Sequence, residues 1–278
     1  MTFYGIDISE WQNGLSLKKA EAEGISFVII RTGDGTYRDR CFHSHLADAD
    51  GTSMEKAVYH YMHKDIRGSI STCLSMLGGR KDLPVWLDFE APGERFTASD
   101  IRLAKELLAA AGVRCAGIYS YVPFWEGLGD PALPPGLFVW VAAYPVNSPA
   151  TPARRYESLG GREHRQWQHP LSNKKPVMWQ FTSTGCVAGF QLDCNAFEGT
   201  RAELETLFSH GGKKMTAPKH LSPDYQRLTF EQLAGPGRTP QGKPDFKGWT
   251  QLGGHTVVDA LAVIGQTLGI PGFGLGGK

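Results

Sequence analysis

Two carboxylates, Asp88 and Glu90, occupy alternate positions at the end of the apolar run Leu83–Phe89. Because successive side chains of a strand point to opposite faces, this spacing puts both acids on the same side of a sheet. Like charges that close raise the pKa of one acid and keep it protonated near neutral pH. A protonated acid beside an ionised carboxylate is what cleavage of a glycosidic bond requires. Spacing alone leaves open that the two acids merely solvate a strand end.

Two further acids belong to predicted strands. Asp7 lies between Ile6 and Ile8, so we expect its side chain to face the interior or the rim of a barrel. An isolated interior carboxylate is costly unless it is paired or hydrogen-bonded. Asp193 lies in the segment Phe190–Phe197. Three acids, each at a predicted strand end, are harder to attribute to chance than one.

Aromatic residues gather in or just after the predicted strands. Flat rings with a polar edge suit the apolar faces of carbohydrate, although each ring taken alone more commonly fills a core. As a group, the rings that we expect to bind substrate are Tyr61, Trp86, Tyr119, Trp140, Tyr144 and Trp179.

Strand-like runs alternate with helical patterns, which favours βα units around a parallel sheet. Seven or eight strands in about 210 residues fit a barrel better than an open sheet. The expected strands are Tyr4–Ile8, Phe27–Arg31, Val58–Tyr61, Val85–Phe89, Ala116–Ser120, Leu137–Ala142, Val177–Phe181 and Phe190–Phe197. The expected helices are Leu15–Glu23, Ile66–Leu77, Ser99–Ala111, with Ser99 as N-cap and Gly112 as its stop, and Arg201–Ser209.

The pattern weakens after Tyr144. Residues 145–176 contain five prolines and a polar run, which indicates a long loop or insertion, and a turn is expected at Ser183–Gly185. Residues 1–209 are the expected catalytic barrel, 210–247 a linker, and 248–278 a small module with one amphipathic helix over Thr256–Leu268. A cell-wall-targeting role for that module and a structural or oligomerising role are both open.

Composition narrows the possible partners. A net charge of +1 gives no field that would collect nucleic acid, and no run of apolar residues is long enough to span a membrane. The five cysteines are odd in number and scattered, which favours free thiols, although Cys186 and Cys194 are close enough in sequence to pair. The N-terminus lacks the features of a signal peptide, so we expect synthesis in a cytoplasm. No cofactor is expected, and the oligomeric state is unknown.

A series of motifs resembles glycoside hydrolase family 25, the lysozymes typified by bacterial and phage muramidases. In chain order they are Gly5-Ile6-Asp7-Ile8-Ser9-x-Trp11-Gln12, Phe27-Val28-Ile29-Ile30-Arg31-Thr32, Tyr59-His60-Tyr61, Leu83-Pro84-Val85-Trp86-Leu87-Asp88-Phe89-Glu90, Gly117-Ile118-Tyr119-Ser120, Val139-Trp140-Val141-Ala142-x-Tyr144, Trp179-Gln180-Phe181 and Asp193-x-Asn195-x-Phe197. The resemblance covers about residues 1–208. It implies an irregular α/β barrel, TIM-like, with eight strands and fewer than eight helices.

The resemblance also implies a reaction: hydrolysis of the β-1,4 bond from N-acetylmuramic acid to N-acetylglucosamine in bacterial peptidoglycan. Glu90 matches the general acid, and Asp7, Asp88 and Asp193 complete the acidic cleft. For the second step we favour the N-acetyl group of the substrate as nucleophile, with Asp88 or Asp193 stabilising the intermediate; direct attack by a carboxylate or a water is the alternative. A phage endolysin, released to the cell wall through a membrane lesion, is the expected biological role.

Three alternative functions were also considered. His43-x-His45 and His60-x-x-His63 could suggest a zinc amidase, but a zinc site needs three or four convergent ligands, and His60 between two tyrosines is typical of a structural histidine. A chitinase is a possible alternative within the hydrolases. A non-catalytic wall-binding barrel is the alternative from another class, although a binder gains nothing from an acid pair.

Overall fold

The chain divides into two units, Met1–Lys214 and Met215–Lys278. The computed structural model describes residues 1–209 and, in the second unit, Val263 and Thr267, which are helical. The expected linker 210–247 and the rest of the expected module 248–278, including most of its helix, lie outside the described residues.

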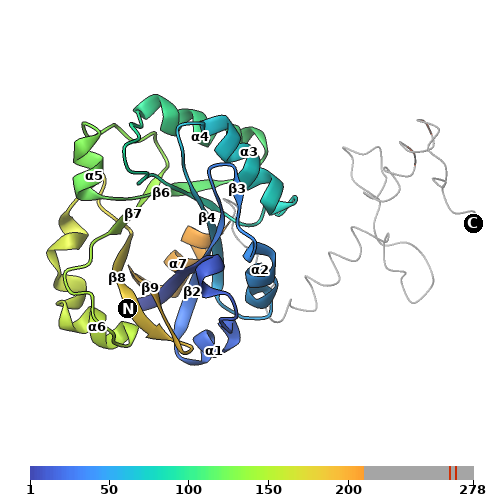
Figure 1. The fold of residues 1–278 in the computed structure, drawn as a ribbon. Coiled ribbons are helices and arrows are strands. Elements are labelled where there is room, and N and C mark those ends of the chain that lie inside the picture. Colours follow the sequence, from blue (N-terminus) through green and yellow to red (C-terminus); the bar gives the residue numbers. More distant parts are fainter. Residues whose placement is uncertain (210–262, 264–266, 268–278) are drawn as a thin grey trace, which may run out of the picture. The chain divides into compact units, whose positions relative to one another are not determined.

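Residues 1–209 form alternating strands and helices (Figure 1). The strands are β1 (Thr2–Ile8), β2 (Ile25–Asp34), β3 (Tyr37–Arg38), β4 (Glu55–Tyr61), β5 (Val85–Asp88), β6 (Cys115–Tyr121), β7 (Phe138–Ala142), β8 (Met178–Val187) and β9 (Phe190–Glu198). The α-helices are α1 (Leu17–Ala22), α2 (Phe42–Asp50), α3 (Ile66–Leu77), α4 (Ala98–Ala110), α5 (Val122–Gly127), α6 (Pro152–Ser158) and α7 (Arg201–Phe208). Short 3-10 helices are η1 (Glu10–Gln12), η2 (Gly161–Glu163) and η3 (Arg165–Gln168).

Eight of these strands close a barrel within residues 1–209. Their order is β1-β9-β8-β7-β6-β5-β4-β2, and β2 pairs with β1 to complete the circle. All neighbours are parallel except β9, which runs antiparallel to both β8 and β1. The prediction of an irregular barrel with eight strands and fewer than eight helices is confirmed for this part of the chain; the sheet is mixed rather than all parallel.

Two apolar layers hold the barrel together. Side chains that alternate along each strand pack either outward against the helices or inward across the barrel, as the two-residue period of a strand requires. The outward layer includes Ile118 and Trp179. The inward layer includes Trp86, Tyr119 and Trp140, whose rings meet edge to face.

Helix α7 closes one end of the barrel. Its apolar side chains Leu204 and Phe208 belong to the inward layer, and the Phe208 ring lies 5.1 Å from that of Phe27, near the start of β2. This is the amino-terminal end of the parallel strands. The acids lie at the opposite end, where the parallel strands finish. Helices α1 to α6 surround the strands (Figure 1).

Three expectations about local structure were wrong. Residues 145–176 are not one long loop, because they contain α6, η2 and η3. Thr97, rather than Ser99, caps α4: its hydroxyl accepts from the amide of Asp100, whose carboxylate accepts from the amide of Thr97. Strand β8 continues through the expected turn at 183–185, and the hairpin turns at Ala188 and Gly189 instead.

The cysteines are free, and Cys186 and Cys194 do not form a disulfide. Among the described residues, no helix combines the length and apolar character needed to cross a membrane.

Candidate active site

The four acids picked out from the sequence converge at the carboxyl-terminal end of the barrel. Asp7 is near the end of β1, Asp88 ends β5, and Glu90 follows two residues later. Asp193 lies near the start of β9, and because β9 is antiparallel its start is at the same end of the barrel as the ends of the other strands. The charge of Asp7 acts on each of the other three carboxyls, which places all four in one electrostatic cluster.

Asp7 is buried and held by two amides. Gln180 on β8 donates from Nε2 to Oδ2 of Asp7 over 2.8 Å, and Asn195 on β9 donates from Nδ2 to the same oxygen over 2.7 Å. Burial raises the pKa of Asp7 to about 6, while these two hydrogen bonds act to lower it because they favour the ionised form. Asp7 is therefore the acid of the cluster best suited to carry a negative charge near neutral pH.

A second set of donors fixes those two amides. Tyr119 donates from its hydroxyl to Oε1 of Gln180 over 2.7 Å, and the hydroxyl of Tyr144 donates to the same oxygen. Trp140 donates from Nε1 to Oδ1 of Asn195 over 2.8 Å. Since each amide oxygen is occupied by a donor, each amide must turn its NH2 group to Asp7. Sequence reasoning did not assign this role to Gln180 and Asn195, although both lie in the family motifs and Asn195 shares a strand face with Asp193.

Glu90 combines partial burial with access to a cavity. It lines a cavity of about 600 Å³, with Tyr119, Tyr121 and Tyr144 among its walls. Burial, followed by the charge of Asp7, raises the pKa of Glu90 to about 7. A carboxylic acid that keeps its proton near neutral pH and reaches a cavity can protonate a leaving oxygen, as a general acid does.

Asp88 is more deeply buried than Glu90. Its Oδ1 has no hydrogen-bond partner among the described residues. Burial, then the charges of Glu90, Asp7 and Asp34, hold the pKa of Asp88 well above its ordinary value. Asp88 is therefore protonated in this arrangement, since a buried charge without partners would be costly.

Asp193 is the fourth member of the cluster. Burial, with smaller contributions from the charges of Asp7 and Glu90, raises its pKa to about 8. At neutral pH the cluster thus holds protons on several carboxyls at once, because like charges so close together cannot all ionise. One ionised carboxylate among protonated acids is the arrangement that glycosidic cleavage uses.

The aromatic residues expected to bind substrate fall into two groups. Tyr61 and Tyr144 are partly exposed beside the acids, and Tyr119 lines the cavity. Trp86, Trp140 and Trp179 are fully buried and offer no surface to a ligand. Trp179 packs outward against Tyr156. The single-residue alternation along β8, which turns Gln180 inward, turns Trp179 out of the site.

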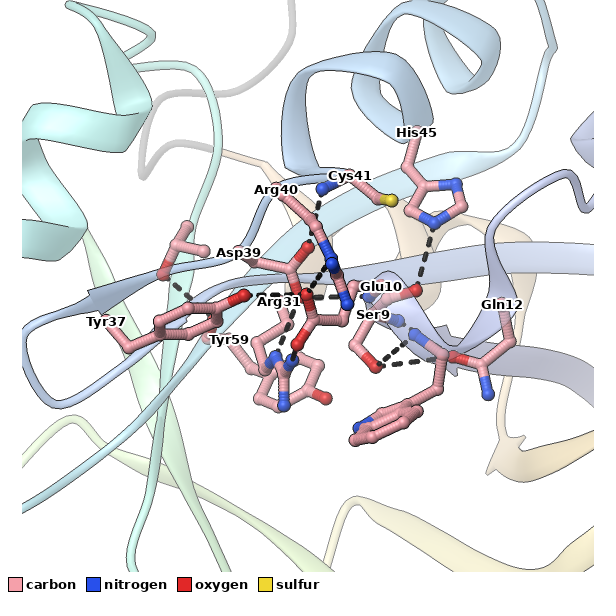
Figure 2. Close-up of polar contacts among 12 residues, drawn as sticks. Ser9, Glu10, Gln12, Arg31, Tyr37, Asp39, Arg40, Cys41, His45 and Tyr59 are labelled. Atoms are coloured by element: carbon pink, nitrogen blue, oxygen red, sulfur yellow. Dashed lines mark hydrogen bonds and ion pairs between the residues drawn. The ribbon is translucent and has the colours of Figure 1, made fainter.

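A network of polar side chains braces the segment that follows Asp7 (Figure 2). Ser9 caps η1, and Glu10 accepts from Tyr37, Arg31 and Arg40 over 2.7, 3.3 and 2.6 Å. Asp39 accepts from the amide of Glu10 and from Nε of Arg31. These bonds join the turn after β1 to the end of β2 and so fix the backbone that carries Asp7.

The histidines do not form a metal site in the part of the chain that the structure describes. No group of three or more His, Cys, Asp and Glu side chains there is arranged to hold a metal ion. His60 is buried, bonded to the hydroxyl of Thr32 and to the carbonyl of Gly35, and burial lowers its pKa to about 4. His60 is thus a neutral structural histidine, as its position between two tyrosines predicts.

Comparisons with known proteins identify the family of the chain. The sequence model described as "Glycosyl hydrolases family 25" matches residues 6–190, and one described as "Rv3766 C-terminal domain" matches residues 229–270. The chain is 24% identical to Lysozyme M1 of Streptomyces globisporus over 227 residues, which cover 73% of this chain and 70% of that protein.

Solved structures share the fold. A family GH25 lysozyme from Aspergillus fumigatus superposes with a TM-score of 0.56 at 20% identity, over 75% of this chain and all of that one. A family 25 glycosyl hydrolase from Streptococcus pneumoniae gives 0.60 at 23%, over 74% and 92%. The catalytic domain of the endolysin from Listeria phage P40 gives 0.54 at 21%, over 76% and 98%. The chain belongs to glycosyl hydrolase family 25, a family of lysozymes, and is a glycoside hydrolase.

Proposed function

We propose that this protein is an N-acetylmuramidase that hydrolyses the β-1,4 bond between N-acetylmuramic acid and N-acetylglucosamine in peptidoglycan. One observation carries the proposal: Glu90, with a pKa raised to about 7, reaches a cavity beside the hydrogen-bonded carboxylate of Asp7. The relationship to Lysozyme M1 supports peptidoglycan as the polymer.

Glu90 is the general acid in this proposal, and it gives its proton to the oxygen that leaves. As the glycosidic bond breaks, the N-acetyl oxygen of the substrate attacks the anomeric carbon, and Asp88 or Asp193 stabilises the resulting intermediate. Water, deprotonated by Glu90, then attacks the same carbon and returns the N-acetyl group, which completes the hydrolysis. Asp7 remains ionised and favours positive charge that develops on the sugar. Direct attack by a carboxylate or an activated water is the competing route.

Product analysis tests the cleaved bond. Purified cell wall is digested, the new reducing ends are reduced with borohydride, and the fragments are identified by mass spectrometry. Reduced muramic acid is the expected product. Reduced glucosamine would identify a glucosaminidase, and new amino termini would identify an amidase or peptidase. Chitin digested in parallel tests the alternative of a chitinase, which would release soluble fragments from chitin as readily as from wall.

De-N-acetylated wall tests which group attacks the anomeric carbon. Removing the acetyl groups from the glycan takes away the proposed nucleophile without altering Glu90. We expect cleavage to fall to a trace. Cleavage of the modified wall at a rate near that of the native wall would favour the route through a carboxylate or water.

The biological role that we propose is host lysis by a phage endolysin, in which residues 248–278 direct the enzyme to the wall. The shared fold with the P40 endolysin is compatible with this role. Wall pull-down compares the full chain with a chain ending at Ser209. Equal binding and equal lysis by the two proteins would contradict the targeting role. Cytoplasmic expression should leave a sensitive host intact until its membrane is permeabilised; lysis without that lesion would contradict the release step.

A further inference from the structure

His63, which follows β4, lies between two carboxylates. Its Nδ1 is 2.6 Å from Oε1 of Glu94, and its Nε2 is 2.7 Å from Oδ1 of Asp34. Ionised carboxylate oxygens only accept hydrogen bonds, so both ring nitrogens must carry protons for both bonds to form. The geometry therefore requires His63 to be a positively charged imidazolium between Asp34 and Glu94.

The surroundings of His63 favour that charge. The pKa of His63 is raised, first by the hydrogen bond to Glu94 and then by that to Asp34. Oε2 of Glu94 is buried and has no hydrogen-bond partner among residues 1–209, so the imidazolium is the group that offsets this carboxylate. Of the other ionisable groups nearby, His60 is neutral, Tyr61 lies 5.6 Å away ring to ring, and Lys64 pairs with Asp100 instead.

The ring fits closely against the backbone. A Cβ atom added to Gly35 would lie 2.7 Å from Cδ2 of His63, and Gly35 has a φ of +55° that glycine adopts without strain. The amide of His63 donates to the hydroxyl of Ser69 on α3. His63 is thus seated by the turn after β2 and by α3, rather than extended freely into solvent.

The two ion pairs join three neighbouring strand ends. Asp34 ends β2, His63 follows β4, and Glu94 lies in the segment after β5. The amide of Glu94 donates to the carbonyl of Ala91 over 3.2 Å, which makes a turn directly after Glu90. Fixing Glu94 to His63 therefore fixes the turn that orients the general acid.

The charges of Asp34 and Glu94 also act on residues of the active site. The carboxylate of Asp34 contributes to the raised pKa of Asp88, and both Asp34 and Glu94 contribute to the raised pKa of Tyr61. An imidazolium between Asp34 and Glu94 offsets those two negative charges at the edge of the cleft.

We propose that His63 is a positioning residue for the glycosidase reaction: as an imidazolium it fixes the turn that follows Glu90 and offsets the charges of Asp34 and Glu94 beside Asp88. This role rests on the proposed function for its effect on catalysis, while the protonation of His63 can be measured independently of activity.

Nitrogen NMR of the imidazole groups of the full chain tests the protonation. His63, assigned by its loss in His63→Gln, should keep protons on both nitrogens at pH 7 and titrate above the ordinary histidine value of about 6.5. Glu94→Gln and Asp34→Asn should each lower that pKa. Titration of His63 at or below that ordinary value would overturn the proposal.

Kinetics test the role in catalysis. His63→Gln should lower kcat about ten- to a hundredfold with little change in KM, because a small displacement of a catalytic group costs that much. The acidic limb of its pH profile should stay in place, because that limb belongs to Asp7 and the charge of Asp34 acts on Asp88 instead.

The control and the outcomes separate the two proposals. His43→Gln should leave kcat and the pH profile unchanged. A His63→Gln protein with the kcat of the wild type would overturn the positioning role. An inactive wild-type protein would instead contradict the proposed function.

Discussion

Asn195 donates a hydrogen bond from Nδ2 to Oδ2 of Asp7 over 2.7 Å, so the antiparallel strand β9 directly holds a carboxylate on β1. Gln180 on β8 supplies the second bond to the same oxygen. Both amides are in turn fixed by buried aromatic donors. The negative charge of the cluster is thereby assigned to Asp7, and the proton to be transferred is left to Glu90.

Activity should depend on pH in a bell shape. The rate should rise as Asp7 loses its proton near pH 6 and fall as Glu90 loses its proton near pH 7. The two apparent values belong to the cluster as a whole, because the acids titrate together. Turbidity loss of purified wall, measured from pH 4 to pH 9 at constant ionic strength, checks this. A rate that stays constant through pH 8 would contradict the assignment of Glu90 as the acid.

Asn195→Ala should raise the pKa of Asp7, because it removes a hydrogen bond that favours the ionised form. The acidic limb of kcat/KM should therefore move to higher pH. The indole N–H of Trp140 also loses its acceptor, which costs about 1–3 kcal/mol of stability. Asn147→Ala is the control, since Asn147 bonds Thr182 and Ser183 and no member of the cluster. Asn147→Ala should lower Tm and leave the acidic limb of kcat/KM at the same pH. If the acidic limb does not move in Asn195→Ala, the role of Asn195 is contradicted.

Glu90→Gln should abolish most wall hydrolysis, since loss of a general acid costs on the order of 10²–10⁴ in rate. Glu126→Gln is a matched control, because Glu126 lines the same cavity but is exposed. The rate of hydrolysis of purified wall at pH 6 should be low for Glu90→Gln and close to wild type for Glu126→Gln. If Glu90→Gln clears the wall at the wild-type rate, Glu90 is not the general acid.

The same substitution should have a pH-dependent effect on stability. Folding raises the pKa of Glu90 from 4.5 to about 7, so the folded state binds the proton more tightly than the unfolded chain. That contribution to stability is complete below pH 4.5 and is lost as pH rises through 7. Glu90→Gln should therefore gain Tm relative to wild type with increasing pH, by about 2–4 °C for each kcal/mol. Scanning calorimetry from pH 4 to pH 9 measures this, and a difference that does not vary with pH would contradict it.

How far the sequence predicts this site depends on the kind of residue. Asp88 and Glu90 could be found because their alternate spacing follows an apolar strand, and strand periodicity fixes their common side. Gln180 and Asn195 lie in strands as well, yet their role depends on β9 running antiparallel, and local pattern does not reveal strand direction. Trp86 and Trp179 show the same limit, since both were expected to bind substrate and both are buried.

The accuracy of the predicted fold also depends on the kind of element. Strands that are buried on both faces, such as β5, are near-continuous apolar runs and could be located to within about two residues. Helices α5 and α6 were missed because each spans two turns or fewer and begins next to a proline, where the period of an amphipathic helix has too few residues to show. The contact of His63 with Asp34 and Glu94 joins residues 29 and 31 positions apart and appears only in three dimensions.

Gly117 on β6 is a position in the barrel wall with no room for a methyl group. A Cβ atom there would lie 2.2 Å from the carbonyl oxygen of Phe138 and 2.6 Å from the ring of Trp86, so β6 and β7 would have to separate. Gly117→Ala should lower stability by about 1–3 kcal/mol, typical of overpacking. Because Tyr119 is two residues away on the same face, activity should fall as well. Gly127→Ala, which meets no atom within 4 Å, is the control for both urea unfolding and wall hydrolysis. Equal unfolding midpoints for the two variants would show that β6 and β7 accommodate the added methyl group without loss of stability, which would contradict the prediction.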